Sequence, residues 1–392
     1  VEDTLFYRAS RLVALQEVGG APGRFGVGPA EFHLLQQERA QLWPHAMTSL
    51  TTHDTKRTED TRARMLEMAE VPDAFAKFTH EVFSMVPPPD AATGHFLLQN
   101  VVGVWPADGA TNEALRERLH AYATKAIREA GVHTTWFDVE DGFEQQVLAW
   151  VDALLDGPAA EIITDFASLL HRGGVQVSLG RKALQLAGAG VPDTYQGQEF
   201  LDFSLVDPDN RRFVDYAARA DALDSYLAQR EGEGEGEGDF NLRAFLGAEA
   251  EPGGADGYTW LAGEGASLAK QLITREGLQL RREHPDLFLE GGHQAVFAVG
   301  EADEHLVGLA RGATSAPGSA EGLGVIAVAT RLPLALHERG GWGETTLQLP
   351  SGEWADRFTG RVFTGVVRVA DLLDTLPTAL LVSTRLTEAA RL

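Results

Sequence analysis

The 392-residue sequence contains no cysteine. This excludes disulfides, thiolate catalysis and cysteine-based zinc sites, and it is compatible with a cytoplasmic location, which we expect. No run of apolar residues is long enough to span a bilayer, and the most apolar segments, such as 379–382, have the length of a core strand. We therefore expect no membrane partner. The N-terminus begins Val-Glu-Asp, with neither an initiator methionine nor a signal peptide, which predicts a chain that starts inside a longer polypeptide.

Basic residues are also scarce. Lysine and arginine number 33 against 57 acidic residues, for a formal charge of −24. This balance argues against a nucleic-acid partner, because neutralising phosphates requires a basic surface. A neutral, polyhydroxylated substrate is indifferent to the charge, so a sugar fits. The hydrophobic content of 44% is sufficient for a full core, and the length predicts two or three domains.

A short segment, 47–52, is rich in β-branched residues and ends in the polar cluster 51–57. It is typical of a buried strand that presents functional side chains at its carboxyl end. Residues 59–69 follow as a helix with charges on one side. The order strand, polar loop, helix predicts the βα unit of an α/β protein.

From 70 to 187 the sequence predicts almost continuous helix, most clearly over 114–130, 143–155 and 159–170. A second short apolar stretch at 184–191 then runs into the polar, turn-rich loop 192–199, again as at a strand end. The Glu-Gly repeat 231–238 predicts a disordered surface loop, and residues 266–283 predict a last helix. An insertion this long between two βα units predicts a separate helical subdomain.

Beyond residue 287 the sequence consists of short β runs at 295–299, 306–309, 324–330, 345–349, 362–363 and 379–384. Their regular punctuation predicts an antiparallel β-sandwich. The expected fold class is thus α/β plus all-β: the C-terminal part of a (β/α)8 barrel with a large helical insertion, followed by the sandwich. The chain holds too few strands to close a barrel, so the others are expected upstream. The predicted domains are 1–69 (with the seventh strand), 70–187 (helical insertion), 188–285 (with the eighth strand) and 286–392 (sandwich).

His53 and Asp54 stand at the end of the first predicted strand. Three interpretations are open for this pair. It can be an ordinary helix N-cap, with Glu59 complementing the helix dipole. It can contribute to a metal site, although no further ligand stands nearby at a suitable spacing. It can also bind a sugar, with Asp54 as a catalytic carboxylate.

Three stretches together carry a resemblance to a known family. They are TTHDTKRTEDTRAR at 51–64, EDTLFYR at 2–8 with EVGG at 17–20, and GVPDTYQGQE at 190–199 running into LVDPDNRR at 205–212. The chain resembles the C-terminal half of the maltooligosyltrehalose synthases, which belong to the α-amylase family of glycoside hydrolases. The first stretch resembles their seventh-strand segment, and the resemblance covers essentially the whole chain.

The resemblance implies an intramolecular transglycosylation. The α-1,4 bond at the reducing end of a maltooligosaccharide is converted to an α,α-1,1 bond by a retaining mechanism, with no cofactor or metal. In the family the nucleophile and the general acid come from the fourth and fifth barrel strands, which this sequence lacks. The implied partners are a maltooligosaccharide and the missing N-terminal half, in the same chain or as a cleaved fragment, and this chain alone is expected to be inactive.

The resemblance also implies roles for individual residues. Asp54 is the transition-state stabiliser, His53 binds the same sugar ring, and Lys56 and Arg57 face the released glucose. A solvated helix start is the alternative for Lys56 and Arg57. Further residues are implied to bind substrate or to support the site, with surface turns and loop capping as the alternatives: Glu2, Tyr7, Tyr195 and Gln196 for substrate, and Asp3, Asp207, Asp209, Asn210 and Arg211 for support.

Two rival functions stay open. One is a related hydrolase of the α-amylase family that uses the same Asp54 and releases sugar to water. The other is a carbohydrate-binding fragment with no catalytic activity.

Overall fold

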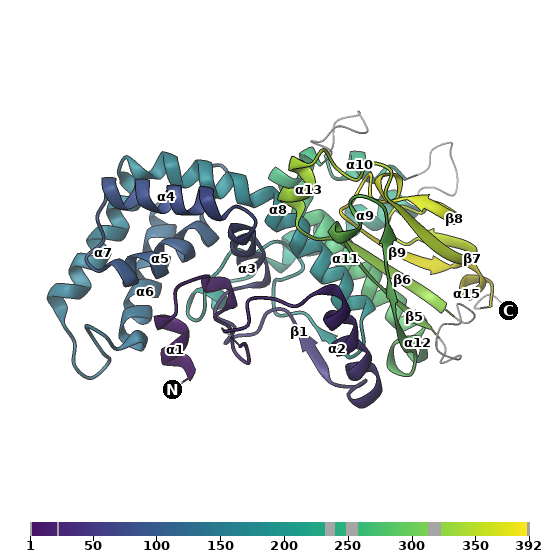
Figure 1. Ribbon diagram of the computed structural model, residues 1–392, viewed down its shortest axis with the longest axis horizontal. Coiled ribbons are helices and arrows are strands. Elements are labelled where there is room, and N and C mark those ends of the chain that lie inside the picture. Colours follow the sequence, from purple (N-terminus) through teal and green to yellow (C-terminus); the bar gives the residue numbers. More distant parts are fainter. Residues whose placement is uncertain (1, 22, 232–239, 248–257, 313–322, 390–392) are drawn as a thin grey trace. The chain divides into compact units, whose positions relative to one another are not determined.

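The fold is known from a computed structural model that describes residues 2–21, 23–231, 240–247, 258–312 and 323–389 (Figure 1). The chain divides into two compact units, neither of which is continuous in sequence. Unit 1 comprises Val1–Gly26, Thr51–Val175 and Asp202–Phe213; unit 2 comprises Val27–Leu50, Gln176–Leu201 and Val214–Leu392. The boundaries between the two units all fall within the predicted domains 1–69, 70–187 and 188–285 and do not coincide with their ends. The four domains stay a prediction. Except for Glu231, where a helix ends, the Glu-Gly repeat 231–238 lies outside the described residues.

Unit 1 is helical in the part of it that the structure describes. Its elements are α1 (Glu2–Arg8), η1 (Val13–Leu15), α3 (Glu59–Leu66), η2 (Glu67–Ala69), α4 (Pro72–Met85), α5 (Ala91–Val104), α6 (Glu113–Ala130), α7 (Asp141–Asp156) and η3 (Asp209–Arg211). The helix α8 (Ala159–Ala187) begins in unit 1 and continues into unit 2. The prediction of nearly continuous helix from 70 to 187 is confirmed, and the helix at 59–69 is confirmed as α3 with η2.

Local signals set the helix ends of unit 1. The side chain of Asn112 accepts a hydrogen bond from the backbone N–H of Leu115 and so caps the start of α6. The same helix ends at Gly131, which has the left-handed φ of 58° that glycine adopts without strain. Asp90 caps α5 in the same way, through the N–H of Thr93. These ends were readable from the sequence because each cap depends on neighbours along the chain.

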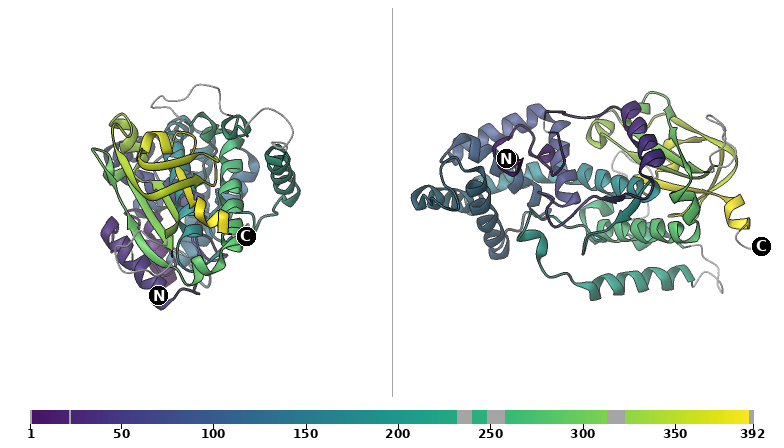
Figure 2. Two further views of the ribbon diagram at one scale, coloured as in Figure 1. Left: turned by 90° about the vertical axis from the view of Figure 1, so that its right-hand side faces the viewer. Right: turned by 90° about the horizontal axis from the view of Figure 1, so that it is seen from below.

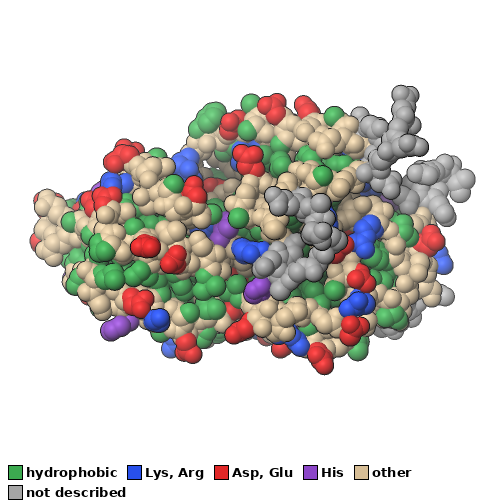
Figure 3. Space-filling model, turned by 90° about the horizontal axis from the view of Figure 1, so that it is seen from above, with side chains coloured by type: hydrophobic (Ala, Val, Ile, Leu, Met, Phe, Trp, Pro, Cys, Tyr) green, Lys and Arg blue, Asp and Glu red, His purple; other side chains and the backbone are tan. Residues whose placement is uncertain are grey.

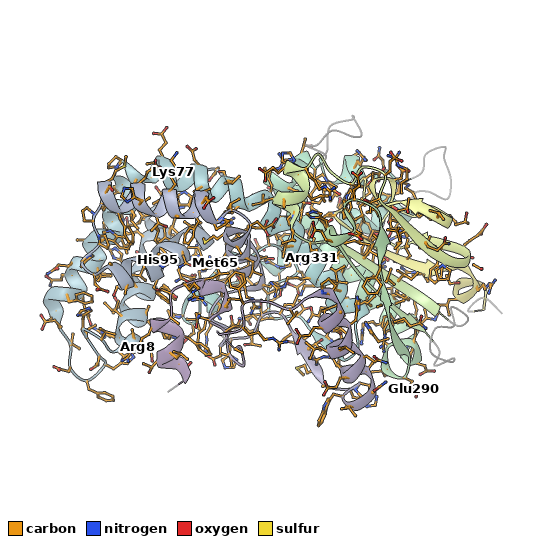
Figure 4. The ribbon with its side chains drawn as sticks, in the orientation of Figure 1. Arg8, Met65, Lys77, His95, Glu290 and Arg331 are labelled. Atoms are coloured by element: carbon orange, nitrogen blue, oxygen red, sulfur yellow. The ribbon has the colours of Figure 1, made fainter. Side chains whose placement is uncertain are left out.

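Glycines let two helices approach α3 closely, one at its backbone and one at its side chains. A Cβ atom added to Gly174 of α8 would lie 2.5 Å from the Cα of Arg64. One added to Gly103 of α5 would lie 3.0 Å from the sulfur of Met65, a buried side chain labelled in Figure 4. The helix α3, which carries the second part of the stretch 51–64, is therefore packed closely by α8 and α5 at positions where glycine leaves room for it.

Unit 2 contains a pair of parallel strands and several helices. The elements are α2 (Pro29–Leu42), β1 (Met47–Ser49), β2 (Val191–Asp193), α9 (Tyr216–Glu231), α10 (Leu242–Phe245), η5 (Thr259–Ala262), α11 (Glu264–Glu283) and α12 (Pro285–Leu289). Met47 pairs with Val191 and Ser49 with Asp193. Gly190 has a φ of 103°, and a Cβ there would lie 2.7 Å from the carbonyl oxygen of Ala46. Glycine is thus required where the two strands come together.

The second predicted strand begins later than expected. The apolar stretch 184–191 was predicted as strand, but α8 continues to Ala187 and β2 starts only at Val191. A short apolar run does not by itself distinguish the end of a buried helix from a buried strand, and here the helix extends across it. The helix predicted at 266–283 is confirmed as α11.

The C-terminal part of unit 2 is an antiparallel sheet, hereafter the C-terminal sheet. The described strands are β3 (Gly292–Val296), β4 (Ala298–Val299), β5 (Leu306–Gly312), β6 (Leu323–Thr330), β7 (Thr346–Asp356), β8 (Val362–Arg368) and β9 (Thr378–Ser383). Their order is β3-β5-β6-β9-β7-β4, with β8 paired to β7. The green and yellow strands of this sheet face the viewer in Figure 2, left. Short elements connect or follow them: η6 (Asp303–His305), α13 (Pro333–Glu338), α14 (Val369–Leu372) and α15 (Thr384–Ala389).

All the described strands of this part belong to one hydrogen-bonded sheet, whereas the predicted sandwich has two. The strand β7 is the reason. Its first half pairs with β4 and its second half with β9, while β8 pairs with both halves across an irregular register between Gln348 and Glu353. The antiparallel strands themselves are confirmed.

The core of the C-terminal sheet follows the alternation of side chains along its strands. Ile326 and Val328 of β6 belong to a buried apolar cluster that also contains Leu347, Trp354 and Leu381. The alternate residues of β6, Ala327 and Ala329, point to the opposite face, and a Cβ at Gly180, in the unit 2 part of α8, would lie 2.8 Å from the Cβ of Ala329. Both faces of β6 are buried, as its continuous apolar sequence indicates.

None of the described helices is long and apolar enough to cross a membrane. On the face drawn in Figure 3, acidic side chains are dispersed among apolar and basic ones and do not gather in a single patch.

The contact at Gly174 gives a testable prediction. An alanine in a helix interior normally stabilises relative to glycine by about 1 kcal/mol, but Gly174→Ala would force its methyl against the backbone of α3. We expect the variant to lose about 1–3 kcal/mol of unfolding free energy in chemical denaturation. Gly142→Ala in α7 is the matched control, because its methyl meets only the flexible end of Glu140, 3.3 Å away. Equal stability of the two variants would contradict the packing described here.

Candidate functional site

His53 and Asp54 lie at the tip of a tight turn in unit 1, after the end of β1. The hydroxyl of Thr52 accepts hydrogen bonds from the backbone N–H groups of Asp54 (3.3 Å) and Thr55 (3.1 Å). The hydroxyl of Thr55 in turn donates to the carbonyl of Thr52 (3.0 Å) and accepts from its N–H (3.0 Å). These reciprocal bonds hold the turn in one conformation, and both His53 and Asp54 are exposed.

A second pair of bonds closes the base of this turn. The N–H of Glu59 donates to the hydroxyl of Thr51 (2.9 Å), and that hydroxyl donates to the carboxylate of Glu59 (3.1 Å). Both side chains are 1% exposed. The helix α3 begins at Glu59 with Thr58 as its N-cap residue, several residues beyond Asp54. The interpretation of Asp54 as a helix N-cap is therefore wrong.

The side chain of Lys56 is only 4% exposed, beneath two carboxylates. Its ammonium lies 3.0 Å from the Oδ1 of Asp54 and 3.1 Å from the Oδ1 of Asp3 in α1. Burial lowers the pKa of Lys56, but the hydrogen bonds to Asp54 and Asp3 outweigh burial, so the pKa is raised above its ordinary value. Lys56 therefore carries a charge at neutral pH.

Arg57 is buried as well, at 1% exposure. Its Nε donates to the side-chain oxygen of Asn100 (2.9 Å), and its Nη1 donates to the carbonyl of Gln16 (2.7 Å). Its backbone forms an isolated antiparallel bridge with Leu205. Arg57 thus joins three segments of unit 1 to the turn, two through its guanidinium and one through its backbone. Because Lys56 and Arg57 are both buried, the alternative of a solvated helix start is wrong for both.

The N-terminal residues Glu2, Asp3 and Tyr7 belong to the helix α1 and not to a surface turn. Asp3 is 66% exposed and pairs with Lys56. Tyr7 is 6% exposed and packs against Phe96, with ring centroids 6.0 Å apart, and its burial raises the pKa of its hydroxyl far above the ordinary value. The side chain of Glu2 lies outside the described part of the structure.

The segment 207–211 forms an ion-pair network within unit 1. Asp207 pairs with Arg211 (2.7 Å), and Asp209 pairs with Arg118 of α6 (2.7 Å). The amide of Asn210 donates to the carbonyls of His53 (2.9 Å) and Thr52 (3.4 Å). Asn210 therefore holds the backbone that carries Asp54.

Tyr195 and Gln196 belong to unit 2, in the turn after β2. Tyr195 is half-buried, Gln196 is exposed, and the carbonyl of Tyr195 accepts a hydrogen bond from the N–H of Gln198 (3.0 Å). The next residue, Gly197, has a φ of 86°, and a Cβ there would lie 3.0 Å from a methyl carbon of Val214. The turn therefore requires glycine next to Gln196.

Sequence reasoning missed two supporting residues. Glu17 accepts a hydrogen bond from the backbone N–H of Lys56 (2.8 Å) and pairs with Arg62 (3.2 Å). Asn100, in the middle of α5, accepts from Arg57 and is fully buried. Glu17 at least stands in the EVGG stretch noted above, whereas no local signal distinguishes Asn100 from any polar residue in a helix.

The site presents hydrogen-bonding groups over a fixed base. An exposed carboxylate at Asp54 and an exposed imidazole at His53 suit the recognition of hydroxyl groups. Among the described residues, no group of three or more histidine and acidic side chains is placed to hold a metal ion.

No family model matches the chain. A curated relative from Mycobacterium tuberculosis, described as "Putative maltooligosyl trehalose synthase", is 43% identical over 382 residues, which cover 97% of this chain and 43% of the relative. The structure of maltooligosyltrehalose synthase from Arthrobacter ramosus matches with a TM-score of 0.82 and 40% identity over 98% of this chain and 44% of that one. A hypothetical maltooligosyl trehalose synthase from Sulfolobus tokodaii matches with a TM-score of 0.72 and 25% identity, over 97% of this chain and 45% of that one.

The chain thus has a mixed helical and antiparallel-sheet fold, which it shares with these solved structures. The particular relatives are the maltooligosyltrehalose synthases, and the resemblance noted from the sequence is confirmed over nearly the whole chain. The chain spans less than half the length of each of these relatives.

The Thr51–Glu59 pair gives a prediction for stability. Thr51→Val keeps the shape of the side chain but leaves the buried carboxylate and the N–H of Glu59 without the hydroxyl. We expect a loss of about 1–3 kcal/mol of unfolding free energy in urea titrations. Thr51→Ser keeps the hydroxyl and should lose clearly less. If the serine variant is as unstable as the valine variant, the hydroxyl bonds do not support the turn.

Proposed function

We propose that the chain is part of an intramolecular transglycosylase that converts the reducing-end α-1,4 linkage of maltooligosaccharides into an α,α-1,1 linkage. The observation that carries the proposal is the 43% identity, over 97% of the chain, with a relative described as such a synthase. The structure supports it with an exposed Asp54 on a rigid turn within the most characteristic stretch. The partners are a maltooligosaccharide and the remainder of the enzyme, since the chain covers 43–45% of its relatives.

Asp54 acts in this proposal as the transition-state stabiliser. A retaining mechanism needs a carboxylate nucleophile and a general acid on either side of the scissile bond, and we assign both to the rest of the enzyme. Asp54 accepts hydrogen bonds from hydroxyls of the reacting ring, including the 2-OH. These bonds strengthen as the ring gains oxocarbenium character, so they lower the barrier more than they stabilise the bound substrate.

Other exposed residues are assigned to the sugar, and the buried ones to support. We assign His53, Tyr195 and Gln196 to sugar hydroxyls because they are exposed or half-buried. Arg57 and Tyr7 are expected to contact sugar on the resemblance alone, but both side chains are buried in unit 1. We therefore propose that Arg57 and Tyr7 support the turn and α1 and do not contact the substrate.

We further propose that β1 and β2 are adjacent strands of a (β/α)8 barrel whose other strands lie in the rest of the enzyme. The support is the parallel pairing of the two strands in unit 2, with 72% of Met47 and 43% of Val191 exposed at one rung of the ladder. Apolar side chains at the start of two parallel strands are normally covered, because parallel sheets are buried on both faces.

The first prediction concerns products. The full-length enzyme that contains this chain should convert maltopentaose mainly into a non-reducing trehalosyl sugar, detected as loss of reducing ends without loss of chain length. The 392-residue chain alone should give no turnover, because the proposed nucleophile and acid lie elsewhere. Maltose and glucose as the main products would favour the hydrolase. Turnover by the isolated chain would contradict the division of the catalytic groups.

The second prediction concerns Asp54. Asp54→Asn in the full-length enzyme should lower kcat/KM about 100-fold or more, the usual effect of removing a group that stabilises transition-state charge. The melting temperature should change little, because asparagine keeps an oxygen acceptor and Lys56 keeps Asp3 as its charged partner. Asp165→Asn, at an exposed position of α8 in unit 1, is the matched control and should leave turnover unchanged. Near-normal turnover of Asp54→Asn would return this residue to a structural role.

A further inference from the structure

The ammonium of Lys56 has an acceptor for each of its three N–H groups. Asp54 supplies two of them, its Oδ1 at 3.0 Å and its backbone carbonyl at 3.2 Å, and Asp3 supplies the third, its Oδ1 at 3.1 Å. A lysine ammonium has three donors and no acceptor. A sugar hydroxyl could therefore reach Lys56 only by displacing one of these three acceptors, and the 4% exposure of the side chain leaves little surface for it.

The carboxylates of Asp3 and Asp54, unlike the buried ammonium of Lys56, are exposed. Asp3 is 66% exposed and Asp54 is 53% exposed, so both carboxylates face solvent while the ammonium lies beneath them. Two like charges held close together repel each other, and a buried cation shared between them offsets the repulsion. The cation also fixes the direction of each carboxylate.

The helix α1 fixes the position of Asp3. Phe6 and Tyr7 are buried at 2% and 6% exposure, and the ring of Phe6 lies 5.9 Å from the ammonium of Lys56. Arg8, labelled in Figure 4, donates to the carbonyls of Ala130 (2.6 Å) and Gly131 (3.1 Å) at the end of α6. Asp3 is thus held on a short helix that is itself tied down at its far end.

The other charged groups around Lys56 have their own partners. Glu17 accepts from the backbone N–H of Lys56 and pairs with Arg62, and Arg57 is bound by Asn100 and Gln16. Besides burial, the groups that shift the pKa of Lys56 are Asp54 and Asp3. Asp3 is therefore the carboxylate that shares the Lys56 ammonium with Asp54.

We propose that Asp3 is a positioning residue for Asp54, acting through the ammonium of Lys56 that the two carboxylates share. The inference rests on the proposed function, because it assigns Asp3 to the same reaction. It also changes the role of Lys56: this side chain orients the stabilising carboxylate instead of binding the released glucose. Asp3, in turn, contributes to turnover without touching the reacting ring.

A double-mutant cycle in the full-length enzyme tests this inference. Asp3→Asn keeps the size and one acceptor oxygen of the side chain but removes its charge, and we expect kcat to fall about tenfold with KM little changed. In the background of Asp54→Asn, the same change should have almost no further effect, because Asp3 acts through Asp54. Asp3→Glu keeps the charge and should have a higher turnover than Asp3→Asn. Asp165→Asn, which removes an exposed carboxylate of α8, is the control and should leave turnover unchanged.

A second measurement follows the ammonium directly and does not depend on activity. The pKa of Lys56 can be obtained from the pH dependence of competitive amine labelling, read by peptide mass spectrometry. Because the hydrogen bond to Asp3 raises this pKa, Asp3→Asn should lower it by about half a unit or more, and Asp165→Asn should not change it. A role of Asp3 that does not involve the Lys56 ammonium would leave the pKa of Lys56 unchanged.

The outcomes separate the inference from the proposed function. If Asp54→Asn strongly lowers turnover and Asp3→Asn lowers it by the same factor in the Asp54→Asn background as alone, Asp3 acts independently of Asp54. That result overturns the inference. An unchanged pKa of Lys56 in Asp3→Asn overturns it as well. Near-normal turnover of Asp54→Asn instead overturns the proposed function, and with it any positioning role. If Asp3→Asn lowers the melting temperature, the pKa of Lys56 and the turnover of Asp3→Glu still test the positioning role.

Discussion

The burial of charged side chains between residues 56 and 67 is the constraint on which unit 1 depends. Lys56, Arg57, Glu59, Asp60, Arg64 and Glu67 are all between 1% and 3% exposed. Removing an ionised group from water is costly unless hydrogen bonds or opposite charges replace the solvent, so each of these side chains requires a partner. Arg64 shows the cost: its burial lowers its pKa to about 9, although it donates to the carbonyls of Gly103 and Trp105 and stacks on Phe203.

The partners of these charges come from distant parts of the chain and thereby join them. Lys56 binds Asp3 of α1, Arg57 binds Asn100 of α5, and Asp60 accepts the N–H of Asp202 from the segment before the 207–211 network. The interactions of Lys56 and Arg57 also hold the turn that carries Asp54, because these two residues directly follow it. The role proposed for Asp54 requires a carboxylate that is rigid and faces solvent, and this arrangement provides one, because buried contacts already order the turn.

Much of the fold could be predicted because its signals are local. Capping by Asn112 and termination at Gly131 define α6, and the punctuated β runs match the strands of the C-terminal sheet. The joining of those strands in one sheet could not be predicted, because it depends on β7 pairing with both β4 and β9. Of the candidate site, the exposure of His53 and Asp54 agrees with a strand-end turn, but the burial of Arg57 and Tyr7 does not follow from their neighbours in sequence.

The sequence by itself determined the element types, the strand-turn-helix that carries Asp54, and the resemblance to the maltooligosyltrehalose synthases, because these depend on residue types at short spacing. Only the tertiary structure decided which charges face solvent. Lys56 and Asp54 are two residues apart, yet one is buried and the other exposed, since α1 places Phe6 and Asp3 against the ammonium. The charge of a side chain can be read from the sequence, whereas its burial depends on partners that only the folded chain brings together.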